Sequence, residues 1–259
     1  MKSHATHRTT VEALLGATLM TGGLVTVTPV AQAITIPVPC GENALVAAVN
    51  LANSTTTADT LVLASGCTYS MTAARGGASN ALPVITTPIE MVGPATVTNA
   101  SPLGLRLFRI AEVGPTGSLT LTTGVAFTRG NVGGDGGGIL NRGAVTLTGS
   151  TLTGNTASGN GGGLANADTP SGTAPAATST NSPVSGNTTP LGEGGGLYNG
   201  LRGTLTATGV TDNHALSALG QSGGVYRQGG TMTTTNSPIT ANTPNNGVGS
   251  TPAVPHCTG

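Results

Sequence analysis

Lysine is scarce in this chain, and none occurs after residue 33. The sequence has nine Lys and Arg and nine Asp and Glu residues; without Lys2, Arg8 and Glu12, positions 34–259 keep seven arginines and eight carboxylates. Soluble domains typically have about 25% charged residues. No basic face can therefore be assembled. This argues against binding to nucleic acid and excludes a polybasic patch that contacts membrane lipids, since both need clustered Lys and Arg.

Aromatic residues and cysteines are also scarce. With no Trp, two Phe and three Tyr, the core must be narrow and aliphatic. The three cysteines, Cys40, Cys67 and Cys257, are too scattered for a zinc site, and we predict neither metal nor cofactor. In an exported protein two of the three are expected to pair. We predict a Cys40–Cys67 disulfide, because Cys40 precedes a predicted capping helix and Cys67 lies in the first predicted strands.

The first 33 residues are predicted to be a secretory signal peptide. Lys2 and Arg8 form a basic start, an apolar stretch runs from Ala13 to Val27, and Ala31-Gln32-Ala33 is a small-residue cleavage signal. A transmembrane anchor is the alternative, but the stretch is shorter than the roughly 20 apolar residues of a span. We therefore expect cleavage after Ala33 and a secreted, extracellular protein without membrane attachment.

A degenerate repeat of roughly 26 residues dominates the rest of the chain. Its Gly-Gly-Gly-[Ile/Leu]-x-Asn signature begins at Gly136, Gly161 and Gly194, and a more degenerate copy begins at Ser222. Each copy is followed by a segment in which aliphatic residues alternate with Thr, and then by an aliphatic residue three positions before an Asn. These closing asparagines are 32, 26 and 29 residues apart: Asn155, Asn187, Asn213 and Asn242.

These repeats predict an all-β fold, a right-handed parallel β-helix of about six coils. Alternation with period two indicates strands with one buried face, and stacking on the next coil about 4.8 Å away buries continuous rows of Leu, Ile and Val. The recurring Asn is expected in the left-handed conformation, hydrogen-bonded to its copies above and below. A β-sandwich is the competing fold. It does not require the same Gly cluster and the same Asn in every unit.

The ends of such a solenoid need caps, because each end exposes a strand edge. Residues 42–53 predict one helix, with Leu45, Ala48, Val49 and Ala52 on its apolar face. The expected organisation is a signal peptide (1–33), an N-terminal cap with this helix (34–58), the β-helix (59–245) and a C-terminal tail (246–259).

The Gly-Gly-Gly-[Ile/Leu] clusters, together with aliphatic-x-x-Asn, resemble the repeats of polymorphic outer-membrane-type proteins, with Phe mostly replaced by Leu, Val or Ile. The segment from Cys40 to Tyr69 is similar to the start of secreted actinobacterial β-helix repeat proteins. The resemblance implies the fold and is nearly silent about activity. The sequence has no segments that resemble an autotransporter barrel, so display on an outer membrane is not implied.

Enzymes that cleave polysaccharides, such as pectate lyases and polygalacturonases, share this fold class, so catalysis has to be considered. Glycoside hydrolysis needs two carboxylates about 5 to 10 Å apart, yet the polygalacturonase signatures are missing. One column precedes the Gly clusters: Asp135, Asn160, Glu193 and Gln221. We interpret it as a solvated turn column; calcium binding by Asp135 and Glu193 is the alternative.

Tyr198 and Tyr226 occupy equivalent positions of two repeats, directly after a core aliphatic residue. Period-two alternation turns both outward, which predicts an exposed stacked pair that could bind sugar or serve only as strand packing. Two other sets of residues suggest chemistry, around His214 and at Ser222 in Gly-x-Ser-x-Gly. We interpret both as turns of the repeat.

The sequence thus predicts a non-catalytic secreted β-solenoid with a structural, adhesive or glycan-contacting role, a polysaccharide or cell-surface ligand being the expected partner. A polysaccharide lyase or glycoside hydrolase with an atypical site is the alternative. The oligomeric state is left open.

Overall fold

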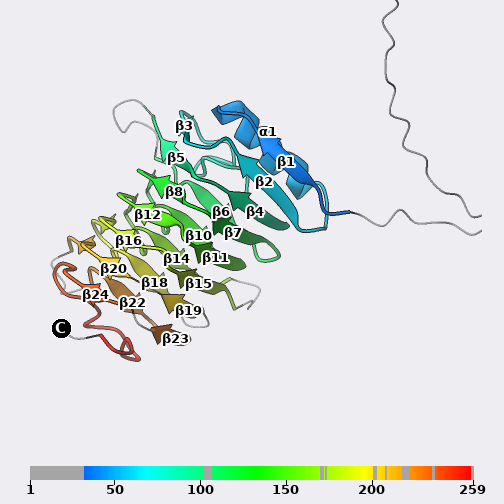
Figure 1. The fold of residues 1–259 in the computed structure, drawn as a ribbon. Coiled ribbons are helices and arrows are strands. Elements are labelled where there is room, and N and C mark those ends of the chain that lie inside the picture. Colours follow the sequence, from blue (N-terminus) through cyan, green and yellow to red (C-terminus); the bar gives the residue numbers. More distant parts are fainter. Residues whose placement is uncertain are drawn as a thin grey trace, which may run out of the picture. The chain divides into compact units, whose positions relative to one another are not determined.

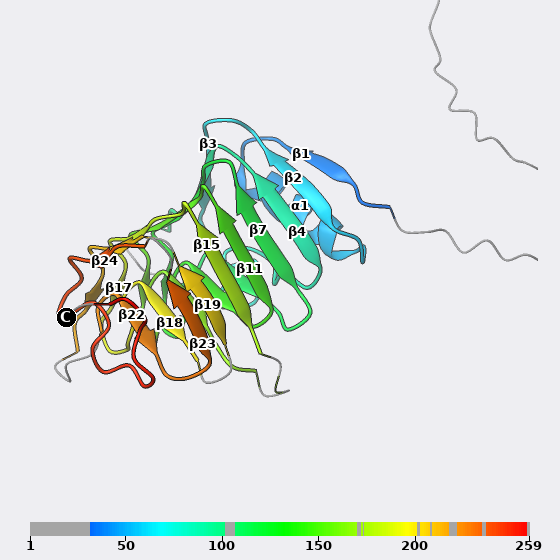
Figure 2. The same ribbon diagram turned by 60° about the horizontal axis from the view of Figure 1, so that its bottom comes forward.

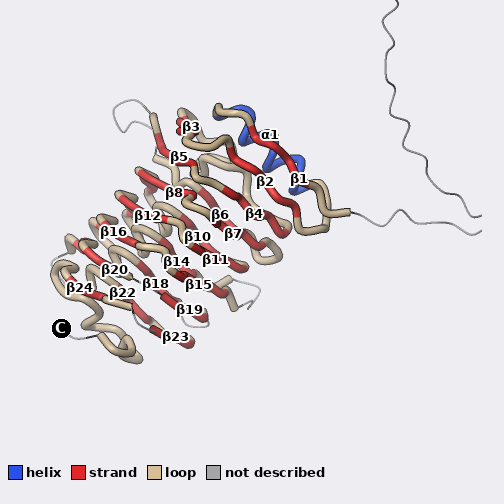
Figure 3. Tube along the Cα trace, in the orientation of Figure 1, coloured by secondary structure: helices blue, strands red, loops and turns tan. Residues whose placement is uncertain are grey.

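The computed structural model describes residues 32–101, 107–169, 172, 174–200, 203–207, 209–217, 222–234 and 237–257. Most of the predicted signal peptide lies outside these ranges. The described chain is a parallel β-solenoid of about seven turns with one short helix (Figures 1 and 3). The prediction of an all-β parallel β-helix with an N-terminal helix is confirmed. The turn count is slightly above the expected six, because β1 (Thr35–Val38) lies within the predicted cap and pairs with β2 (Asp59–Leu63).

Four successive coils run through four parallel sheets, numbered here in chain order. Sheet 1 contains β1, β2, β4 (Pro88–Val92), β7 (Ser118–Thr122), β11 (Ala144–Thr148), β15 (Ala176–Thr180), β19 (Thr204–Ala207) and β23 (Thr231–Thr234). Sheet 2 contains β3 (Cys67–Met71), β5 (Ala95–Asn99), β8 (Val125–Thr128), β12 (Thr151–Thr153), β16 (Val184–Ser185), β20 (Val210–Thr211) and β24 (Ile239–Thr240).

The two shorter sheets complete the coil. Sheet 3 contains β9 (Asn131–Val132), β13 (Thr156–Ala157), β17 (Thr188–Thr189) and β21 (His214–Ala215). Sheet 4 contains β6 (Ala111–Val113), β10 (Ile139–Asn141), β14 (Leu164–Asn166), β18 (Leu197–Asn199) and β22 (Val225–Arg227).

The core is a set of aliphatic rows that run along the solenoid. In sheet 1, Val145 pairs with Leu119 and Leu147 pairs with Leu121, and all four side chains are buried. The residues between them on each strand face outward, as the burial pattern of β11 shows. Period-two alternation in the sequence therefore sets which face of each strand is buried.

A ladder of four asparagines runs through the solenoid where sheet 2 ends: Asn155, Asn187, Asn213 and Asn242. The side-chain oxygens of Asn187, Asn213 and Asn242 each accept two hydrogen bonds from the Asn of the preceding coil, one from its backbone N–H and one from its side-chain amide, at 2.9–3.0 Å. The oxygen of Asn155, the first of the ladder, accepts instead from the backbone N–H of Gly130. The predicted contact between successive copies is thus confirmed.

The predicted left-handed conformation of these asparagines is wrong. Positive φ occurs one residue earlier, at Gly154 (63°), Gly186 (63°), Asp212 (57°) and Ala241 (58°). The preceding residue makes the turn, and this leaves each Asn side chain pointing inward, where it bonds to backbone and to the next Asn.

Helix α1 (Glu42–Asn53) covers the first coil, with Leu45, Ala48, Val49 and Ala52 buried against it. At the opposite end, residues after β24 return to the last coil: the backbone N–H of Val225 donates to Asn246, and the Val254 side chain joins the core. The core is thereby covered at both ends of the described solenoid.

The Cys40–Cys67 disulfide is present, with a Cα–Cα distance of 5.6 Å, and it links a residue two positions before α1 to the first residue of β3. Cys257 is a free thiol in this single chain.

We expect Cys40→Ser with Cys67→Ser to lower the free energy of unfolding by about 3–4 kcal/mol, because the bond closes a loop of 27 residues in the unfolded chain. Urea denaturation measures this, with Cys257→Ser as the control and an expected change below about 1 kcal/mol. Peptide mapping without reductant that finds Cys40 and Cys67 as free thiols would contradict the assignment.

Candidate functional site

The outer face of sheet 4 brings together most of the side chains that the sequence singles out. Its central outward row is Glu112, Leu140, Ala165, Tyr198 and Tyr226, one residue from each of five successive coils. We call this row and its polar rim the tyrosine face. Leu140, Ala165 and Tyr198 form a small apolar cluster with Tyr226 that is separate from the core.

The predicted column lies along one rim of the tyrosine face. Asp135 accepts a hydrogen bond from the backbone N–H of Asn160 at 2.7 Å, and Asn160 accepts one from the N–H of Glu193 at 3.0 Å. Side chains of successive coils thus satisfy the backbone of the next turn. Gln221, the fourth predicted member, lies outside the described residues.

Tyr198 and Tyr226 stack with nearly parallel rings, 6.1 Å between centroids and 5° between planes. The predicted exposure is wrong for Tyr198, whose side chain is buried. Because the rings stack along the solenoid, one face of each is directed at the other, and Gly249 lies beside Tyr226. Their hydroxyls also have partners: that of Tyr198 donates to Gln228, and that of Tyr226 donates to Glu193. The stack therefore offers ring edges, and hydroxyls that are already hydrogen-bonded, rather than an open aromatic platform.

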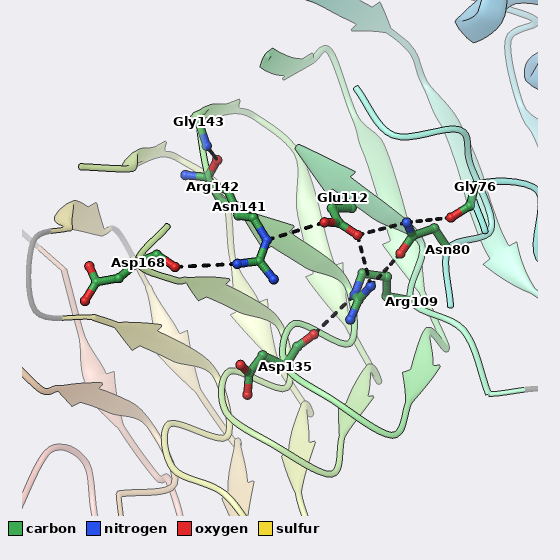
Figure 4. Close-up of polar contacts among 9 residues, drawn as sticks. All are labelled: Gly76, Asn80, Arg109, Glu112, Asp135, Asn141, Arg142, Gly143 and Asp168. Atoms are coloured by element: carbon green, nitrogen blue, oxygen red, sulfur yellow. Dashed lines mark hydrogen bonds and ion pairs between the residues drawn. The ribbon is translucent and has the colours of Figure 1, made fainter. Parts of the chain in front are cut away.

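A charged network that the sequence did not reveal continues the tyrosine face toward the N-terminal coils (Figure 4). Glu112 lies between two arginines, with Arg109 Nη1 at 3.3 Å and Arg142 Nε at 3.4 Å from its carboxylate oxygens. Asn80 donates to the same carboxylate at 2.9 Å and accepts a hydrogen bond from Arg109. Arg109 also donates to the backbone oxygen of Asp135, and its side chain is buried.

In the structure Glu112 occupies the same repeat position as Leu140, because Ala111-Glu112-Val113 pairs in register with Ile139-Leu140-Asn141. This coil lacks the triple-Gly signature, so the equivalence is not visible in the sequence. Arg142 and Asp168 follow strands of sheet 4 at its other edge. Arg142 donates to the backbone oxygen of Asp168 at 3.5 Å.

Burial and nearby carboxylates set the protonation of the face. Burial, followed by the charges of Asp135, Asp168 and Glu193, raises the pKa of Tyr198 to about 12. Its hydroxyl therefore stays protonated and does not act as a base at neutral pH. Burial raises the pKa of the Glu193 carboxyl above its ordinary value, against the hydrogen bond from Tyr226.

We expect Glu193→Gln to increase stability at pH 7 and to change it little at about pH 3.5. A carboxyl whose folded pKa is raised favours folding while protonated, below its unfolded pKa, and this contribution is lost as the pH rises through the folded pKa. Urea melts of both proteins at the two pH values measure the difference. A larger gain at the lower pH would contradict the direction of the shift.

The other sequence candidates behave as turns and strand residues. Asp212 makes the positive-φ turn before Asn213, and His214 begins β21, where its backbone N–H donates to Asn187. Ser222 is fully buried beside the Gly cluster, and Gly220 lies outside the described ranges.

Within the described ranges, no three His, Cys, Asp or Glu side chains are grouped so that they could hold a metal ion. The proposed calcium pair therefore has no third acidic ligand there. What the tyrosine face offers is a row of hydroxyl, amide, carboxylate and guanidinium groups over a small apolar floor. Such a row suits hydrogen bonding to a polyhydroxylated ligand.

A search for membrane-spanning segments in the described part of the chain finds no helix with the length and apolar character to cross a bilayer. In the comparisons with known proteins, no family model, no curated protein and no solved structure matches this chain.

Proposed function

We propose that this protein is a non-catalytic secreted β-solenoid that acts in surface structure or adhesion and contacts a glycan through the tyrosine face. The observation that carries the proposal is the pairing of its charged groups with one another: Glu112 is shared by Arg109 and Arg142. Charged groups held in such pairs help to fix the shape of a surface. The disulfide supports an extracellular location, because disulfides persist in oxidising compartments.

Secretion through the signal peptide and membership of the polymorphic outer-membrane-type repeat proteins belong to this proposal. The support for the family is the sequence motif, with triple-Gly clusters and aliphatic-x-x-Asn in successive coils. The Asn ladder supplies a physical reason for that second motif.

Binding to a polysaccharide array tests the glycan contact. We expect the purified mature protein to bind a subset of glycans, and Asp168→Asn at the edge of the tyrosine face to weaken that binding by about tenfold, the loss of one charge-assisted hydrogen bond. Asp212→Asn is the matched control, since it changes the same group in a turn outside this face. Equal loss in both variants, or no binding by the parent, would overturn the proposal.

A second candidate is a polysaccharide lyase or glycoside hydrolase with an atypical site. It is favoured by one observation: the carboxylates of Asp135, Asp168 and Glu193 all act on Tyr198. Arg109 and Arg142 also donate hydrogen bonds to the backbone oxygens of Asp135 and Asp168. Acid–base cleavage of a glycan requires two titratable groups within reach of the same glycosidic bond, and two of these carboxylates would have to supply them.

We expect no depolymerisation of pectin, alginate or other uronates, with or without added calcium. Assays for reducing and unsaturated ends measure this. Turnover above background that disappears in Asp135→Ala or Glu193→Ala would replace the binding proposal with the enzymatic one.

A further inference from the structure

The outer face of sheet 1 carries a regular array of threonines, which we call the threonine face. In Figure 2 the strands of this sheet lie side by side along the solenoid. Thr146 pairs in register with Thr120 and Thr178, and these rows continue to Thr206 and Thr233, giving one Thr per coil in five successive coils. A second row two residues later contains Thr122, Thr148 and Thr180.

The spacing of the array follows from β geometry. Successive coils are about 4.8 Å apart, and residues two apart on one strand are separated by about 6.6 Å. The array is thus a two-dimensional grid. The sequence has Thr208 and Thr235 two residues after Thr206 and Thr233, where the second row would continue, but both lie outside the described residues.

The threonine face is uncharged over these coils. The five strands that form it, β7, β11, β15, β19 and β23, contain no acidic, basic or aromatic residue. A carboxylate occurs at its N-terminal border, where Thr122 donates to Glu90 at 3.2 Å. The rest of the face therefore has no charge with which to attract a charged ligand, and it has no aromatic ring on which a sugar could stack.

Each Thr presents a methyl group and a hydroxyl on a stiff β-branched side chain. Thr148, Thr178 and Thr180 are exposed, and in the described part of the chain their hydroxyls form no hydrogen bond with another protein group. Water over such a grid is ordered by the methyl groups and bonded to the hydroxyls. Each contact is weak, so strong binding requires a ligand that repeats with the grid in both directions.

We propose that the threonine face binds the surface of ice. Ice is an uncharged lattice of water oxygens that repeats at distances of a few ångströms in two directions, so many Thr sites engage it at once. A single flexible polymer chain repeats in only one direction. This site is on a different sheet from the tyrosine face and does not depend on the proposed function.

The test uses the full mature protein. We expect it to produce thermal hysteresis, to inhibit ice recrystallisation and, when fluorescently labelled, to partition into a growing ice hemisphere. The array variant, Thr148→Lys with Thr178→Lys, should reduce recrystallisation inhibition by at least about tenfold, because two charged side chains interrupt the grid.

The matched control is Thr68→Lys with Thr240→Lys, two exposed outward threonines of sheet 2. It adds the same charge elsewhere and should retain activity. If the Lys variant does not fold, judged by circular dichroism, Thr148→Tyr with Thr178→Tyr replaces it, since Tyr favours strands. Absence of ice activity in the parent, equal activity in the array and control variants, or binding to crystalline cellulose or chitin without binding to ice would each overturn the proposal.

Discussion

Replacing Leu147 with Asp should prevent folding of the mature protein. Leu147 is 2% exposed and stacks on Leu121 of the preceding coil and on the buried Ser179 of the following one, in a narrow, mostly aliphatic interior. A carboxylate there loses its water and gains no positively charged partner, a penalty of several kcal/mol, comparable to the whole stability of a typical domain. The loss of Leu packing adds about 2–5 kcal/mol. We expect no soluble protein, or a chain without a cooperative thermal transition.

Thr146→Asp is the control for this experiment. It introduces the same group one residue earlier on β11, on the outer face. We expect near-normal expression and a change within about 1 kcal/mol, since an outward carboxylate keeps its hydration. The same yield and melting temperature for both variants would show that the inside and outside of this strand are wrongly assigned.

Asn187→Ala should lower the free energy of unfolding by about 4 kcal/mol. The Asn187 oxygen accepts from the backbone N–H and the side-chain amide of Asn155, and its own amide donates to the oxygens of Leu152 and Asn213. Alanine leaves several of these buried groups unsatisfied, at about 1–3 kcal/mol each. Denaturation in urea with the parent protein as reference measures the loss.

Asn50→Ala removes the same side chain from an exposed position of α1. We expect a change within about 0.5 kcal/mol, with a slight gain from the higher helix propensity of Ala. A loss at Asn187 no larger than at Asn50 would mean that the ladder adds little to stability. The position of the recurring Asn would then need a different explanation.

Repeat position in the sequence predicts part of the candidate site. The column of Asp135, Asn160 and Glu193 and the stacking of Tyr198 on Tyr226 follow from repeat position alone, because residues at equivalent positions of a solenoid lie above one another. The burial of Tyr198 does not follow. It depends on the residues packed around the ring, which are Tyr226 stacked on it, Leu140 and Ala165 in the same cluster, and Gln228 at its hydroxyl.

The sequence by itself determined the local pattern: which residues of each strand face inward, where coils turn, where the one helix lies and which cysteines pair. The strand, turn and helix positions are properties of period and spacing, and they act over a few residues. The disulfide joins residues 27 positions apart, but the expected order of cap and first strands already places them together. Only the tertiary structure decided that Glu112 lies between Arg109 and Arg142, and that the threonines of five coils share one face in register. Those contacts join residues of different coils, and loops of unequal length between the strands hide their alignment in the chain.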